Sequence, residues 1–127
     1  MAFEKVTVFE VPAHINSMVQ QQKKEERAAA YIAEDTVYLV VTRGEKPTGG
    51  YDVSVAGIEK TNIGQEGYSV DIYVEYKNPG PGQLVAQVVT YPHVIVKTDL
   101  MNVSRDTVFR FFIGDSLNTV RATELPE

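Results

Sequence analysis

A regular alternation of apolar and polar side chains over residues 68–76 constrains the fold of this chain more than any other feature. Tyr68, Val70, Ile72, Val74 and Tyr76 take every second position, and most positions between them are polar. Successive side chains of a β-strand point to opposite faces of its sheet. The pattern therefore predicts a strand with one buried face and one face in water, which requires a sheet around it.

Other segments extend this β pattern. Residues 36–42 are apolar at most positions, as expected of a central strand that is covered on both faces. Residues 51–55 alternate, and Gly57 then shifts the alternation so that Ile58 falls on the opposite parity, which indicates a β-bulge. We expect further strands at residues 6–11, 84–90, 94–97, 108–113 and 119–122, with the last two joined as a hairpin across residues 114–116.

One short helix is expected near the N-terminus. Residues 13–27 are rich in helix formers, with Ile15, Met18, Val19 and Gln22 at helical spacing. Residues 28–33 fit either an extension of this helix or a strand before a turn at residues 34–35, and we favour the strand. Because strands recur at even spacing with turn residues between them, the fold class predicted is a mostly β, antiparallel sandwich or barrel-like domain.

Composition limits the number of domains and the kinds of partner. The 127 residues are 43% hydrophobic, which suits a single domain over residues 1–127. The 17 acidic and 12 basic residues give a net charge of −5, so we expect no nucleic-acid partner. No stretch approaches the ~20 apolar residues of a membrane span. The sequence as it stands predicts a cytoplasmic protein, and an exported one if a leader was removed.

The residue types that carry catalysis or bind metals occur without the patterns that those functions need. The chain has no cysteine, and Ser54, Ser69 and Ser116 lie in no G-x-S-x-G motif. His14 and His93 stand alone, without a metal-binding H-x-x-x-H pattern. Adjacent carboxylates at residues 25–26 and 34–35 point apart rather than toward one substrate atom. We therefore expect no catalytic residue, no metal and no cofactor.

Three stiff turns are the remaining candidates for function. Proline fixes one backbone torsion, and a pair of glycines allows positive φ, so at least one of Gly49 and Gly50 is expected to adopt it. Rigid loops on a β scaffold often carry binding surfaces, because they lose little entropy on binding. The candidate partner-binding residues are Pro47, Thr48, Gly49, Gly50, Tyr51, Pro79, Gly80, Pro81, Gly82, Tyr91, Pro92 and His93.

The same turns carry a resemblance to a known family. The string G-x-x-P-T-G-G-Y at residues 44–51, the turn at residues 79–82 and the segment 89–92 before an apolar strand resemble the PrcB carboxy-terminal domain family, over about residues 37–97. Members are named after a subunit that stabilises a secreted bacterial protease complex. They are commonly exported, often as lipoproteins, whereas this chain has no cysteine to carry lipid.

A weaker likeness is to the chagasin-type inhibitors of cysteine proteases. These immunoglobulin-like sandwiches present a P-T-T-G-Y-like loop, a glycine-rich loop and an R-P-W-like loop in that order. Residues 47–51, 79–82 and 91–93 follow the same order, but prolines alternate with the glycines of the second turn and the chain has no tryptophan.

These observations predict a non-enzymatic domain that binds a protein partner through rigid loops and that stabilises or regulates a protease complex. The alternative is a small-ligand-binding β domain with Tyr51, Tyr91 or His93 at the mouth of its pocket. An enzyme ranks third. The sequence leaves open whether the chain forms a homo-oligomer.

Overall fold

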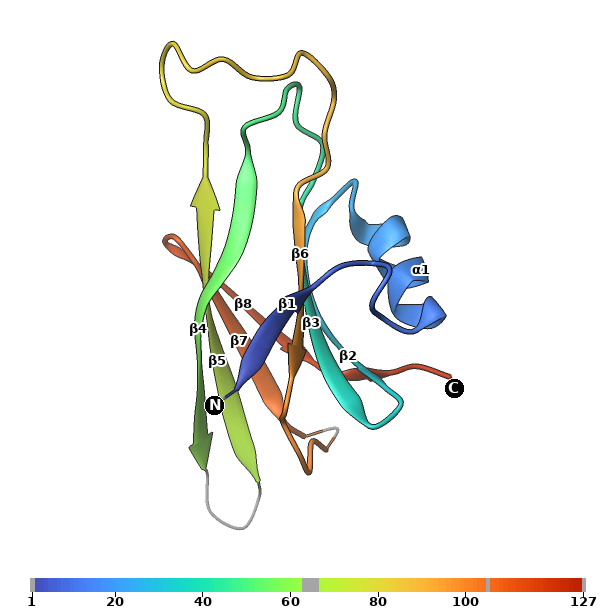
Figure 1. The fold of residues 1–127 in the computed structure, drawn as a ribbon. Coiled ribbons are helices and arrows are strands. Elements are labelled where there is room, and N and C mark those ends of the chain that lie inside the picture. Colours follow the sequence, from blue (N-terminus) through green and yellow to red (C-terminus); the bar gives the residue numbers. More distant parts are fainter. Residues whose placement is uncertain (1, 63–66, 105, 127) are drawn as a thin grey trace.

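Two β-sheets pack face to face, and one helix lies against the outer face of the first sheet (Figure 1). The computed structural model describes residues 2–62, 67–104 and 106–126. In chain order the elements are β1 (Phe3–Val6), α1 (Ala13–Gln22), β2 (Glu26–Ala33), β3 (Thr36–Arg43), β4 (Asp52–Asn62), β5 (Tyr68–Lys77), β6 (His93–Thr98), β7 (Val108–Ile113), β8 (Ser116–Arg121) and β9 (Thr123–Glu124). The expected mostly β sandwich with one short N-terminal helix is confirmed, and the sheets do not close into a barrel.

Both sheets are mixed. The first has the strand order β1-β6-β3-β2-β9 and the second has the order β4-β5-β7-β8. The pairs β2/β9 and β5/β7 are parallel, so the expectation of a purely antiparallel sandwich is wrong for these two pairs. Between β5 and β7 the chain crosses to the first sheet to form β6 and then returns. Two reversals of direction therefore bring β7 beside β5 with the same polarity.

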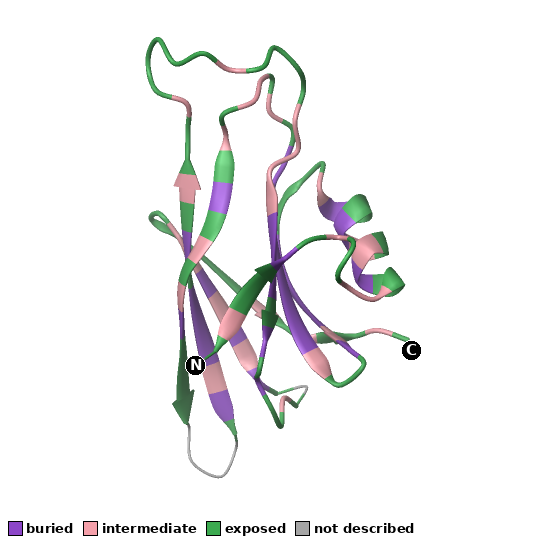
Figure 2. Cartoon of the chain, viewed as in Figure 1, coloured by how far each residue is buried: buried purple, intermediate pink, exposed green. Residues whose placement is uncertain are grey.

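The strand β3 lies in the middle of the first sheet and is buried along most of its length (Figure 2). Val37, Leu39 and Val41 belong to the main core between the sheets, whereas Tyr38 and Val40 pack in a second cluster with the helix. An apolar residue at nearly every position suits a strand that is covered on both sides. The prediction of a central strand at residues 36–42 is confirmed.

The helix ends five residues earlier than expected. It buries Ile15, Val19 and Gln22, and the chain then enters β2, which pairs with β3 from Glu26 opposite Arg43 to Ala33 opposite Thr36. This pairing takes residues 26–27 out of the helix and confirms the strand favoured at residues 28–33. Positive φ at Glu34 and Asp35 closes the two-residue turn of this hairpin.

Two expected strands differ from the structure. Residues 7–11 form no strand, because Glu10 N donates a hydrogen bond to the Thr7 carbonyl at 3.0 Å and the chain turns there toward α1. Residues 84–90 form no strand either, since only Thr90 finds a partner, in an isolated bridge with Lys46. Their β-prone sequence has no neighbouring strand to pair with.

Three local predictions hold, one of them with a shifted boundary. The register between β4 and β5 shifts between Val55 and Gly57, which confirms the β-bulge. Strand β6 contains the expected residues 94–97. The hairpin of β7 and β8 is present, but its turn is shorter than expected because Ser116 already pairs with Ile113. Over the described residues, no helix is long and apolar enough to cross a membrane.

Candidate functional site

Two connections lie together at one end of the sandwich, which we call the loop end: residues 44–51 between β3 and β4, and residues 78–92 between β5 and β6 (Figure 1). Of the twelve predicted partner-binding residues, eleven fall within these two connections. The twelfth, His93, is the first residue of β6. The fold therefore brings the three predicted turns together, although up to 46 positions separate them in the sequence.

Hydrogen bonds join the two connections directly. Lys46 and Thr90 exchange two backbone hydrogen bonds of 2.9 Å, and Gly49 N donates to the Ala86 carbonyl at 2.9 Å. The Thr90 hydroxyl donates to the Thr48 carbonyl at 2.8 Å. These bonds hold the 44–51 connection against the second half of the 78–92 connection, so the loop end is a preformed surface rather than two independent loops.

Gly50 forms the packing contact between the connections. Its φ of 91° confirms that one residue of the glycine pair adopts positive φ. A Cβ atom at this position would lie 2.7 Å from Val85 Cγ1 and 3.0 Å from Pro79 Cβ, whereas at Gly49 the nearest contact would be 3.4 Å. Both the backbone conformation and the close approach of Val85 and Pro79 thus require glycine at residue 50.

Arg43 anchors the base of the loop end, and the sequence reasoning missed it. Its side chain, only 7% exposed, donates from Nη1 to the carbonyls of Asp52 and Lys77 at 3.0 Å and from Nη2 to Asn78 Oδ1 at 2.7 Å. The guanidinium lies 4.1 Å from the ring centre of Tyr76. One side chain thus ties the end of β3 to the start of β4 and the end of β5. The sequence feature that could have indicated this role is a charged residue directly after a run of apolar strand residues.

The two predicted tyrosines each contact charged side chains of the loop end. Tyr51 is half-buried, and its ring centre is 5.5 Å from the Arg43 guanidinium and 5.6 Å from Lys46 Nζ. The Tyr91 hydroxyl donates to Glu45 Oε1 at 3.1 Å, and this hydrogen bond raises the pKa of Tyr91 above its ordinary value.

His93 is held locally. Its Nδ1 lies 2.9 Å from the carbonyl oxygen of Tyr91, and the residue is half-buried. His14, the other histidine, lies on the helix, so the two imidazoles belong to different parts of the fold. Among the described residues, no group of three or more His, Cys, Asp or Glu side chains could hold a metal ion.

The 78–92 connection exposes apolar side chains that the sequence reasoning did not single out. Leu84 is 98% exposed, Val88 56% and Val89 49%. These residues were expected in a strand, where alternate side chains would be buried. Monomeric proteins seldom leave several large apolar side chains uncovered in one short segment, and such a group is typical of an interaction site.

The fold and the loop end define the class of protein: a two-sheet β domain with a preformed surface of joined loops at one end. Residues 37–99 match the family model described as PrcB C-terminal, and over this half of its length the chain belongs to that family. The match runs from β3 to the residue after β6 and includes both connections, which confirms the resemblance expected over residues 37–97. Comparison with curated proteins and with solved structures gives no match. The likeness to chagasin-type inhibitors stays a prediction.

Proposed function

We propose that the chain is a non-enzymatic protein-interaction domain that binds a protein partner through its loop end. The observation that carries this proposal is the set of hydrogen bonds and the Gly50 contact that join residues 44–51 to residues 78–92. Because the surface is already ordered, binding costs little conformational entropy. A surface of this kind suits recognition of another folded protein.

The exposed apolar side chains supply the driving force for binding. Leu84 has almost its whole surface in water, and the residues around it are held by Ala86 bonded to Gly49 and by the Gly80–Gln83 turn. Burying one such side chain at an interface contributes about 1.5–3 kcal/mol. Tyr91, a partly exposed residue of the same connection, adds a rigid aromatic contact.

The partner that we propose is a protease or a subunit of a protease complex, which the domain stabilises or regulates. Support comes from membership of the PrcB C-terminal family, which is named after a subunit that stabilises a protease complex. The family match covers both connections of the loop end, so the segments that we assign to partner binding are also those that define the family.

The test compares loop variants with variants on the exposed face of the second sheet. A partner captured from host extract and identified by mass spectrometry is titrated against Thr48→Ala, Leu84→Ala and Tyr91→Ala. Loss of an interface side chain typically costs about 1–3 kcal/mol, so we expect affinity to fall about 5- to 150-fold. The melting temperature should stay nearly unchanged because all three side chains are at least partly exposed.

The matched controls are Tyr73→Ala and Glu75→Ala, which lie on the outer face of β5. Tyr73 stacks on Phe112 there, with ring centres 5.3 Å apart, so this face offers a competing apolar surface. If the controls abolish binding while the loop variants keep full affinity, the sheet is the interface and the loop proposal is wrong. A captured partner with no effect on the activity or lifetime of any protease contradicts the protease assignment alone.

A second candidate function, the binding of a small ligand, is favoured by one observation. A pocket of about 680 Å³ opens at the end of the sandwich opposite to the loop end, and this volume falls in the range of natural ligand sites. None of Tyr51, Tyr91 and His93, the residues expected at the mouth of such a pocket, lines it. The two candidate functions therefore use opposite ends of the molecule.

A further inference from the structure

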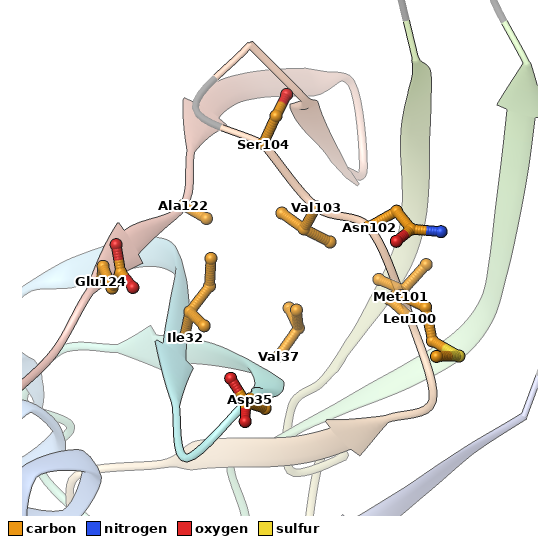
Figure 3. Close-up of a pocket in the computed structure, with 10 residues that line it drawn as sticks. All are labelled: Ile32, Asp35, Val37, Leu100, Met101, Asn102, Val103, Ser104, Ala122 and Glu124. Atoms are coloured by element: carbon orange, nitrogen blue, oxygen red, sulfur yellow. The ribbon is translucent and has the colours of Figure 1, made fainter. Parts of the chain in front are cut away.

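The pocket opposite the loop end has an apolar floor that continues the main core. Its floor is formed by Ile32, Val37, Leu100, Val103 and Ala122, which Figure 3 shows around a central opening. Val37 and Leu100 are almost fully buried, whereas the other three are partly buried and pack against the core. The two sheets thus leave apolar surface open to water here, which an apolar ligand could cover with a gain in free energy.

Hydrogen bonds hold the walls of this pocket in place. The Tyr68 hydroxyl donates to the Met101 carbonyl at 2.6 Å, and the Thr98 hydroxyl donates to the Val37 carbonyl at 3.0 Å. Leu100 N in turn donates to Thr98 Oγ1 at 3.3 Å. The segment from β6 to residue 101 is therefore fixed against β3 and β5, and the pocket exists before any ligand binds.

The polar rim of the pocket is acidic. Asp35, in the turn between β2 and β3, and Glu124, in β9, contribute carboxylates, whereas the polar ends of Asn102 and Ser104 point away from the opening in Figure 3. No Lys, Arg or His is among the described residues that line the pocket, and neither carboxylate forms an ion pair with a described residue. The two carboxylates offer oxygen acceptors and negative charge, which suit an ammonium group with its three N–H donors.

We propose that this pocket binds a small organic cation, in which a primary ammonium group is attached to a compact apolar body. The apolar body covers Val37, Val103 and Ala122, and the ammonium group lies at the rim near Asp35 and Glu124. A metal ion fits less well, because the described residues offer only two ionisable ligands here. This proposal rests on the second candidate function and is independent of partner binding at the loop end.

The test uses three probes that share one aromatic body and differ in charge: 2-phenylethylammonium, 2-phenylethanol and phenylacetate. Each is titrated into the ¹⁵N-labelled full chain at low salt, and amide chemical shifts are followed. We expect saturable shifts at residues 100–104 and 122–124, with the ammonium about tenfold tighter than the alcohol and the carboxylate weakest. An exposed ion pair with each carboxylate accounts for about two- to fivefold of this preference.

Two conservative variants test the assignment of the carboxylates. Asp35→Asn keeps the positive φ of the turn, because asparagine tolerates this conformation, and Glu124→Gln keeps the shape of the side chain. Each should weaken ammonium binding about two- to fivefold and leave alcohol binding unchanged. Asp115→Asn removes one negative charge at the exposed turn between β7 and β8, away from the pocket, and should leave the binding of all three probes unchanged.

Three results would overturn the proposal: equal affinity for the ammonium and the alcohol, shifts confined to other parts of the chain, or no saturable binding of any probe. The Leu84→Ala variant distinguishes the test of the pocket from the test of partner binding at the loop end. It should weaken partner binding and leave the ammonium titration unaltered, so failure at one end of the molecule is distinguishable from failure at the other.

Discussion

At the scale of single residues, Arg43 and Gly50 both shape the loop end. Arg43 ties together three strand ends, and Gly50 lets Val85 and Pro79 approach the 44–51 connection closely. Both depend on contacts with residues far away in the sequence. Substitutions at these two positions should therefore alter stability more than their places near loops suggest.

Replacing Gly50 by valine should lower the free energy of unfolding by about 1–3 kcal/mol, because a β-branched side chain is strained at positive φ and would collide with Val85. Gly49→Ala is the matched control, since its Cβ meets nothing closer than 3.4 Å. Urea unfolding of both variants and the parent measures the difference. Equal midpoints for Gly50→Val and the parent would show that the loop conformation is unimportant for stability.

Replacing Arg43 by methionine should cost about 2–4 kcal/mol, because the variant fills a similar volume but leaves the Asp52 and Lys77 carbonyls without their donor. Arg121→Met, on exposed β8, should change stability by less than about 0.5 kcal/mol. The same unfolding measurement applies. A loss no larger than that of the Arg121 variant would mean that water replaces the guanidinium at no cost.

At the scale of elements, a buried polar cluster attaches the helix to the first sheet. Gln22, the last residue of α1, is 2% exposed. Its Oε1 accepts a hydrogen bond from the Tyr31 hydroxyl at 2.7 Å, and its Nε2 lies 3.4 Å from the Val40 carbonyl. The Thr42 hydroxyl donates to the Glu25 carbonyl at 2.6 Å. This cluster links α1, β2 and β3 and explains why the helix stops where β2 begins.

The cluster predicts a dependence of stability on alkaline pH. Burial raises the pKa of Tyr31 above its ordinary value of 10.0, against a smaller opposing effect of Arg27. As pH rises, the phenol of Tyr31 therefore loses its proton in the unfolded state before it does so in the folded state. The contribution of Tyr31 to the free energy of unfolding is complete below about pH 10 and is lost as pH rises through the folded-state pKa. Unfolding free energies at pH 8, 10 and 11 should fall less steeply for Tyr31→Phe than for the parent. Parallel pH profiles would contradict this.

At the scale of the whole molecule, the two proposed sites lie at opposite ends of one sandwich. The loop end carries rigid connections with exposed apolar side chains, and the opposite end carries the acidic pocket. The main core between the sheets separates them. The family match from residue 37 to residue 99 includes parts of both ends, so the segment that defines the family contributes to each proposed site.

We predict background rates with ester, peptide and phosphate substrates, because the serines and the histidine weighed as catalytic candidates have no catalytic partners among the described residues. Ser54 and Ser69 lie on strands, Ser116 begins β8, and His93 Nδ1 already faces the Tyr91 carbonyl. Chromogenic substrates of each class, with a commercial hydrolase as positive control, provide the measurement. Turnover by the parent that disappears in His93→Ala would make the chain an enzyme and refute the proposed class.

The sequence alone predicts most of the strands, because their period-2 patterns are local properties of short segments. The alternation at residues 68–76, the apolar run at 36–42 and the bulge at Gly57 all hold in the structure. Glycine and proline likewise favour turns as a local property, so positive φ was predictable for at least one of Gly49 and Gly50, and the structure places it at Gly50. The family resemblance rests on the same local strings.

Only the tertiary structure decides which segments meet. A β-prone pattern indicates that a segment can join a sheet, but not that a strand is present for it to pair with. Residues 84–90 were therefore expected as a strand, whereas in the structure they form none and Leu84 is exposed to water. The role of Arg43 depends on three strand ends that meet in space. The parallel pairs and the pocket depend on how the chain crosses between the sheets. Local sequence encodes propensities, whereas contacts between distant residues arise only from the packing of the whole chain.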